Sequence, residues 1–156
     1  MVSGTRANLS RGGRPPLARG RRDHVTVEEL LAAAQAQIPR LTPVQAVAAQ
    51  RQGAILIDIR PAEQRDRDGL VPGAEVISRN VLEWRLDPSC EYRDPTVARL
   101  DRQLVLICDE GYQSSLAAVT LRLFGLDVAD VIGGVQAWRR AGLELRRPGL
   151  GWVAAG

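Results

Sequence analysis

Three short runs of apolar residues mark the chain. The stretches "AILIDI" (54–59) and "QLVLIC" (103–108) are apolar almost throughout, and "DVADVIGG" (127–134) ends in two glycines. The first two runs predict strands that are buried on both faces of a sheet, as in parallel sheets, and the third, which holds two aspartates, predicts a strand.

Segments with helical spacing alternate with these runs. The clearest are 26–38, 43–53, 114–125 and 135–142, with Thr26 and Thr42 as N-caps and Gly125 and Gly142 just past two of the ends. Weaker patterns predict a short polar helix or turn at 61–69, a turn and strand at 71–78, a helical turn at 80–88 and a short helix at 94–101. Strands that alternate with helices predict an α/β domain with a mainly parallel central sheet flanked by helices.

The basic charge of the chain is concentrated at its N-terminus. The net charge is +3 over 156 residues, and residues 1–22 hold six arginines and no acidic residue. Such an Arg-, Gly- and Pro-rich segment cannot bury enough apolar surface to repay the entropy of ordering, so we expect a disordered tail over 1–25. We prefer the interpretation that this tail is simply solvated. Binding of the tail to nucleic acid is the alternative.

Length and composition place the remaining boundaries. We expect a helix at 26–40 that packs on the domain, a single domain over 41–147, and a C-terminal tail over 148–156. No apolar run approaches the roughly 18 residues that a membrane span needs, and the N-terminus lacks the apolar core of a secretion signal. Two widely separated cysteines do not form a disulfide framework, so we expect a cytoplasmic protein without contact with a membrane.

Cys108 stands where a buried strand ends and a loop leads into a helix. Ligands of open α/β sheets bind beyond the carboxyl ends of the strands. The first amides of a helix lack intrahelical acceptors, and the helix dipole is positive there. A loop curled between strand and helix can aim several N–H groups at one atom and so favour a thiolate, which is the reactive form of cysteine.

The neighbours of Cys108 strengthen this interpretation over a buried structural cysteine. Gly111 sits in the middle of the loop, where a tight ring needs an unusual backbone angle or a close approach. Ser114 and Ser115 are candidates to cap the helix, which is apolar nearly all round and would pack deeply against the sheet.

Four segments in order resemble the rhodanese-like (sulfurtransferase) family of single-domain proteins. They are "ILIDIRPAEQ", "GLVPGAEVI", "LVLICDEGYQSSLAA" and "VIGGVQAW", and the resemblance covers about residues 40–145. The resemblance implies a rhodanese-like three-layer sandwich. It implies that Cys108 accepts sulfane sulfur from a donor such as thiosulfate or a low-molecular-weight persulfide and passes it to cyanide, a thiol or a protein acceptor, without a cofactor or metal. The persulfide would be cradled by the backbone amides of Asp109, Glu110, Gly111, Tyr112, Gln113 and Ser114.

The chain departs from the family pattern in two places. Asp109 and Glu110 stand in a loop where many members carry basic or hydroxyl side chains. An acidic rim should disfavour small anions such as thiosulfate and suit a neutral, cationic or protein-bound donor, although carboxylates that point outward would weaken this effect. The histidine of the family's Gly-His-Pro-Gly-Ala turn is replaced at or near Leu70, with structural consequences expected.

Other polar residues are secondary candidates. Arg79 and Arg85 are candidates for the mouth of the substrate pocket, with surface ion pairs to Glu83 or Asp87 as the favoured alternative. Asp58 and Arg60 follow a strand end, and the resemblance implies a mainly structural pair. Cys90 is a candidate resolving thiol, but a lone loop cysteine is more often incidental.

Rival chemistries lack their residues. The sole histidine, His24, lies beside the tail, so a cysteine–histidine hydrolase and a zinc site both lack partners. A cysteine phosphatase needs an arginine just after the loop, and residues 109–121 contain none. The remaining alternative to an enzyme is a non-catalytic rhodanese-like module for binding or regulation.

Overall fold

The computed structural model describes residues 23–149. Most of the expected tail at 1–25 and most of that at 148–156 lie outside this range. Six α-helices and one 3₁₀ helix accompany five strands in the described range. They are α1 (Val27–Ala36), β1 (Arg40–Leu41), α2 (Pro43–Arg51), β2 (Ile55–Asp58), α3 (Ala62–Asp68), β3 (Glu75–Val76), η1 (Arg79–Val81), α4 (Leu82–Leu86), β4 (Leu104–Ile107), α5 (Gln113–Arg122), β5 (Val128–Val131) and α6 (Gly134–Arg140).

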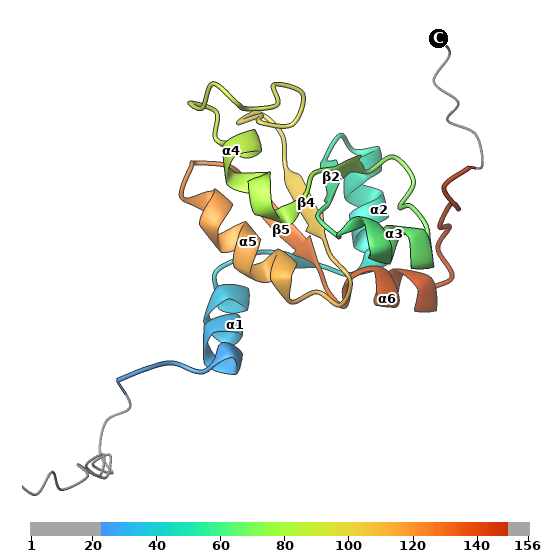
Figure 1. Ribbon diagram of the computed structural model, residues 1–156, viewed down its shortest axis with the longest axis horizontal. Helices are drawn as coiled ribbons and strands as arrows, with labels where there is room; N and C mark the ends of the chain where they lie inside the picture. Colours follow the sequence, from blue (N-terminus) through green and yellow to red (C-terminus); the bar gives the residue numbers. More distant parts are fainter. Residues whose placement is uncertain (1–22, 150–156) are drawn as a thin grey trace, which may run out of the picture.

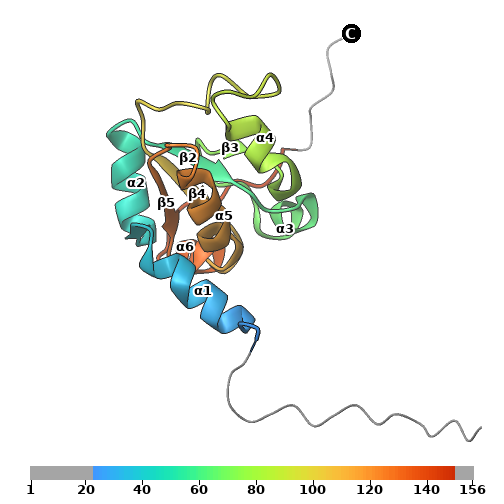
Figure 2. The ribbon, with the colours of Figure 1, turned by 90° about the vertical axis from the view of Figure 1, so that its left-hand side faces the viewer.

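The strands form one parallel sheet in the order β1-β5-β4-β2-β3. Helices cover both of its faces, which gives three layers (Figures 1 and 2). This confirms the predicted α/β class. The parallel pairing also brings the carboxyl ends of all five strands to the same edge of the sheet, where ligand sites of such sheets lie.

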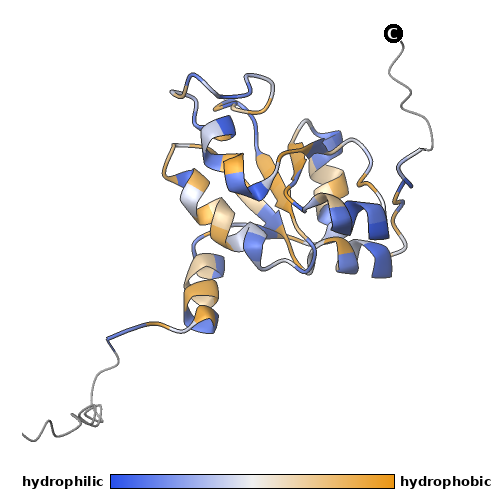
Figure 3. Cartoon of the chain, in the orientation of Figure 1, coloured by the Kyte–Doolittle hydropathy of each residue, from blue (hydrophilic) through white to orange (hydrophobic). Residues whose placement is uncertain are grey.

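Alternate residues of the central strands build two cores, one on each face. Leu104 and Leu106 of β4 belong to the cluster beneath α4 and α5, whereas Val105 and Ile107 belong to the cluster beneath α2 and α6. All four side chains of β4 are buried, as the continuous apolar run predicted. Figure 3 shows β2 and β4 as hydrophobic and the outer helix α3 as hydrophilic.

The predicted caps form at both N-terminal helices. The Thr26 side chain accepts from the Glu29 amide while the Glu29 carboxylate accepts from the Thr26 amide, and Thr42 and Gln45 make the same exchange at α2. Helix α1 lies against α5, and the Gln35 amide donates to the Ser115 hydroxyl across that contact at 3.3 Å.

Two local expectations differ from the structure. The short helix predicted at 94–101 is wrong, because that segment forms only turns. The amides of Val97 and Ala98 donate to the Asp94 carbonyl oxygen as in a first helical turn, but the Arg99 amide donates to Val97, so the helical pattern stops there. The two-residue strand β1, which pairs with β5, was not predicted at all.

Candidate active site

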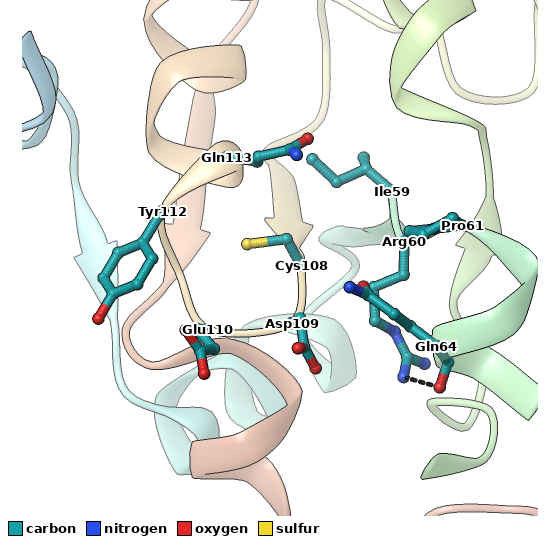
Figure 4. Close-up of a pocket in the computed structure, with 9 residues that line it drawn as sticks. All are labelled: Ile59, Arg60, Pro61, Gln64, Cys108, Asp109, Glu110, Tyr112 and Gln113. Carbon is teal, nitrogen blue, oxygen red and sulfur yellow. Dashed lines mark hydrogen bonds between the residues drawn. The ribbon is translucent and has the colours of Figure 1, made fainter. Parts of the chain in front are cut away.

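Cys108 follows β4 directly and lies at the carboxyl edge of the sheet. The side chain is almost fully buried, with 6% of its surface exposed, yet it lines a pocket between two strand ends (Figure 4). One wall follows β2 and the other is the loop that leads into α5. The lining residues are Ile59, Arg60, Pro61, Gln64, Cys108, Asp109, Glu110, Tyr112 and Gln113.

The loop after Cys108 curls around the sulfur. The backbone N–H of Gly111 donates to Cys108 Sγ at 3.2 Å, and the backbone N–H of Ser114 donates to it at 3.4 Å. The thiol in turn donates to Ser114 Oγ at 3.2 Å. Two amides aimed at one sulfur, together with the N-terminus of the ten-residue helix α5, favour negative charge at that point.

Gly111 is required by the shape of this loop. Its φ angle is +83°, a conformation that L-residues rarely adopt. A β-carbon at this position would lie 2.7 Å from the Gly133 nitrogen and 3.0 Å from the Val131 carbonyl oxygen. The loop therefore packs against the end of β5 at a distance that only glycine permits.

The Gly133–Gly134 pair holds the other side of the loop. The amides of Val135 and Gln136 at the start of α6 donate to the carbonyl oxygens of Cys108 and Asp109 at 2.9 and 3.0 Å. A β-carbon on Gly134 would lie 2.6 Å from the Asp109 carbonyl oxygen, so this approach also requires glycine. Because the carbonyl oxygens of Cys108 and Asp109 accept from α6, they do not face the sulfur.

The two serines do not cap α5 as predicted. The helix begins at Gln113, and both hydroxyls donate instead to Oδ2 of Asp130 in β5, Ser114 at 2.9 Å and Ser115 at 2.7 Å. Arg40 of β1 completes this cluster, with Nε 2.9 Å from Asp130 Oδ1 and Nη2 3.1 Å from the Gly111 carbonyl oxygen. The first turn of α5 and the loop are thus tied to a buried ion pair beneath them.

The acidic side chains of the loop point away from the sulfur (Figure 4). The Asp109 carboxylate accepts from Arg67 at 3.1 Å and from Gln136 at 2.7 Å. The pKa of Arg67 is raised, chiefly by its hydrogen bond to Asp68 and further by Asp109. Glu110 makes no hydrogen bond or ion pair to any residue in 23–149, so it is the uncompensated charge of the pocket rim.

Asp58 and Arg60 form a buried pair beside the pocket. Arg60 Nη2 lies 2.7 Å from Asp58 Oδ2, and both side chains are about 1% exposed or less. Arg60 also donates to the carbonyl oxygens of Gln64 and Gly69, and its guanidinium turns away from Cys108 (Figure 4). These contacts join β2 to α3 and the turn after it, which is a structural arrangement.

Arg79 and Arg85 lie outside the lining of the Cys108 pocket. Arg79 Nη1 is 2.7 Å from Glu83 Oε1, one helical turn away, and Arg79 lines a separate pocket between α1 and α5. Arg85 donates to the Tyr92 carbonyl oxygen and lies 3.6 Å from Asp94, rather than against Asp87. Neither arginine is therefore placed to receive a substrate in this pocket.

The remaining candidates lie apart from the site. Cys90 and Cys108 are both free thiols, and Cys90 does not line the pocket. Leu70 and Arg146 exchange two backbone hydrogen bonds in an antiparallel bridge. Leu70, at or near which the family's histidine was expected to be replaced, therefore makes structural contacts. Among residues 23–149, His, Cys, Asp and Glu side chains nowhere gather in a group of three or more that could hold a metal ion.

The sequence did not reveal Asp130 and Arg40 as parts of the site. Asp130 interrupts the apolar run of β5, and a charged residue inside a strand that is buried on both faces needs a partner. That charge was the available clue. Arg40 offered none, because β1 is only two residues long.

Comparison with known proteins agrees with this geometry. Residues 42–141 match the rhodanese-like domain, so the chain belongs to the rhodanese-like family. It is 30% identical over 104 residues to the thiosulfate sulfurtransferase GlpE of Pseudomonas savastanoi pv. phaseolicola, a match that covers 66% of this chain and 89% of that protein. The thiosulfate sulfurtransferase GlpE of Pseudomonas syringae pv. syringae is 29% identical over 104 residues, which cover 66% of this chain and 89% of that protein.

Solved structures show the same fold. A protein of unknown function from Rhodopseudomonas palustris CGA009, described as a possible tyrosine phosphatase, is 33% identical with a TM-score of 0.72, and the match covers 86% of this chain and all of that one. The polysulfide-sulfur transferase of Wolinella succinogenes, described as a homodimer, is 25% identical with a TM-score of 0.59 over 74% of this chain and 83% of that one. Family and relatives together support sulfurtransferase activity in general. None of the helices at 23–149 has the length and apolar character needed to cross a membrane.

Proposed function

We propose that the protein is a sulfurtransferase that carries sulfane sulfur as a persulfide on Cys108. The observation that carries the proposal is the pair of N–H donors, from Gly111 and Ser114, that converge on the Cys108 sulfur at the floor of an open pocket. Donors preorganised around a charged sulfur stabilise it without reorganisation during the reaction.

The first half of the reaction loads the sulfur. The Cys108 thiolate attacks the outer sulfur of thiosulfate, a sulfur–sulfur bond forms, and sulfite leaves with the electron pair of the broken bond. A low-molecular-weight persulfide would react in the same way and release its thiol. The enzyme then holds a persulfide anion that extends from Cys108 into the pocket.

Free amides in the loop support the binding of this outer sulfur. The backbone N–H groups of Glu110, Tyr112 and Gln113 donate to no acceptor within residues 23–149. Unpaired amides in a loop that leads into a helix N-terminus form an anion-binding site.

The second half discharges the sulfur. Cyanide attacks the terminal sulfur, thiocyanate leaves, and the bonding electron pair returns to Cys108 as thiolate; a thiol or a protein acceptor would take the sulfur likewise. Because both cysteines are free thiols, we also infer a reducing compartment such as the cytoplasm.

Intact mass spectrometry tests the proposal. In a Cys90→Ser background, incubation with thiosulfate or glutathione persulfide should add one sulfur atom, and cyanide or dithiothreitol should remove it. The further substitution Cys108→Ser should abolish the gain. Loading by neither donor would overturn the proposal and favour a binding or regulatory module.

The description of one structural relative as a possible tyrosine phosphatase calls for a parallel assay. A phosphate needs a bidentate arginine at the loop, and the sole arginine among residues 23–149 that lines this pocket, Arg60, is tied to Asp58. We therefore expect no hydrolysis of p-nitrophenyl phosphate by the same preparation.

A further inference from the structure

Asp130 is a buried carboxylate that the sulfur-transfer steps do not use. It lies in the middle of β5, fully buried, and its charge is balanced by Arg40, whose side chain is 20% exposed. Arg40 donates to both carboxylate oxygens, Nε to Oδ1 at 2.9 Å and Nη2 to Oδ2 at 3.2 Å. A carboxylate paired in this way accepts charge-assisted hydrogen bonds, which are stronger than those between neutral groups.

The Ser114 hydroxyl lies between Asp130 and the reactive sulfur. Ser114 Oγ is 2.9 Å from Asp130 Oδ2 and 3.2 Å from Cys108 Sγ. A hydroxyl has a single proton to donate. A carboxylate is a stronger acceptor than a neutral thiol, so this proton goes to Asp130 and Ser114 Oγ presents only lone pairs to the sulfur.

We propose that Asp130 is a positioning residue that, through the Ser114 hydroxyl, favours the protonated thiol of Cys108 in the resting protein. A thiol donates to the Ser114 lone pair, whereas a thiolate would face that lone pair unfavourably. This effect opposes the Gly111 and Ser114 amides, which favour the anion. Because the Ser114 proton stays on the bond to Asp130, no hydroxyl donor is gained when the sulfur ionises.

The other charges around Cys108 do not supply this effect. Asp109 and Glu110 turn their carboxylates away from the sulfur, and Asp109 is paired with Arg67 (Figure 4). Arg60, the cation of the facing wall, is paired with Asp58. All of these charges stay in place when Ser114 or Asp130 is replaced, so they cancel in the comparison of variants.

This inference concerns the same thiol as the proposed function and would limit its oxidation between turnovers, since the thiolate is the form that oxidises. It is tested by the rate at which iodoacetamide alkylates Cys108, measured across pH in a Cys90→Ser background. The rate follows the thiolate fraction, so its pH midpoint reports the protonation of the sulfur.

Ser114→Ala is the decisive variant because it keeps the backbone amide and removes only the hydroxyl. The proposal expects the midpoint to fall by about one pH unit, a tenfold rise in thiolate at a pH below the midpoint. Ser115→Ala is the control, since its hydroxyl bonds to the same carboxylate and reaches the Gly111 carbonyl oxygen at 3.1 Å but makes no contact with the sulfur, and its midpoint should stay unchanged. A midpoint that rises or stays the same in Ser114→Ala would overturn the proposal.

Asp130→Asn tests the carboxylate itself. Its midpoint should fall as well, and the double variant with Ser114→Ala should move no further than the larger single shift. Shifts that add would mean that Asp130 acts by its charge alone and would also overturn the proposal. If Asp130→Asn does not fold, the Ser114→Ala and Ser115→Ala pair decides the question. Alkylation needs no sulfur donor, so a protein that shows the shift but takes up no sulfur would contradict only the proposed function.

Discussion

Arg40 and Asp130 form an ion pair across the edge of the sheet, with Nε 2.9 Å from Oδ1 and the carboxylate fully buried. The pair joins β1 to β5, and Arg40 also holds the Gly111 carbonyl oxygen of the cysteine loop. One arginine near the N-terminal helix therefore stabilises both the sheet edge and the loop around Cys108.

Arg40→Met should destabilise the protein because it leaves Asp130 buried without a counter-charge. Removing one partner of a buried pair typically costs about 3–5 kcal/mol of the free energy of unfolding, and we expect about 3 kcal/mol here because Arg40 is partly exposed. Urea denaturation measures the change. Arg122→Met is the control, since Arg122 lies 3.8 Å from Asp127 at the surface, where ion pairs contribute little. Equal losses in both variants would contradict the role of Arg40.

Gly111→Ala should disrupt the loop and abolish sulfur loading. The substitution combines a φ of +83° with a β-carbon 2.7 Å from the Gly133 nitrogen, so we expect a loss of about 2 kcal/mol or more in stability. Gly142→Ala separates the two causes, because Gly142 has a φ of +72° but no atom within 4 Å of the added carbon. That control should lose about 1 kcal/mol and keep its loading, as measured by intact mass after thiosulfate treatment. Full loading in Gly111→Ala would refute the argument.

The sequence predicted those parts of the structure that follow from local pattern. The apolar runs gave β2, β4 and β5, and the threonine caps and terminal glycines gave α1, α2 and α5 close to their observed bounds. Cys108 and its loop followed from a strand end and a helix start that are adjacent in sequence. Gly111 could be singled out because a short loop between them requires a tight turn.

The parts that depend on pairing across long sequence separations could not be predicted. β1 consists of two residues and exists because it pairs with β5, about 90 residues later. The serine hydroxyls look like helix caps from sequence, and only the fold shows that Asp130 competes for them. The pairing of Arg79 with Glu83, by contrast, joins residues one helical turn apart, and it was the alternative that the sequence favoured.

The acid stability of the protein should depend on Asp68. The pKa of this carboxyl is lowered from its ordinary value of 3.8, chiefly by the hydrogen bond from Arg67 and further by Gln136 and Arg139. A lowered pKa in the folded state gives stability that is present above 3.8 and is lost as the pH falls through the folded value.

Asp68→Asn should therefore show a flatter loss of stability below pH 3.8 than the parent protein. Urea denaturation at a series of pH values from about 7 to about 2.5 measures this. Asp66→Asn, two residues away and exposed, should leave the slope unchanged. Parallel curves for Asp68→Asn and the parent would rule out a contribution from this carboxylate.

Glu110 should select against thiosulfate as the sulfur donor. Its carboxylate lines the pocket rim with no partner among the described residues, whereas the Asp109 charge is compensated by Arg67. Repulsion of a dianion at a solvated rim is on the order of 1 kcal/mol, so Glu110→Gln should speed loading by thiosulfate roughly fivefold. Added salt should speed the parent more than this variant because it screens the repulsion.

Loading by glutathione persulfide should change less, and Glu91→Gln, in an exposed loop away from the pocket, should behave like the parent. Stopped reactions followed by intact mass give both rates, and an equal acceleration with the two donors would show that the charge of Glu110 does not choose between them.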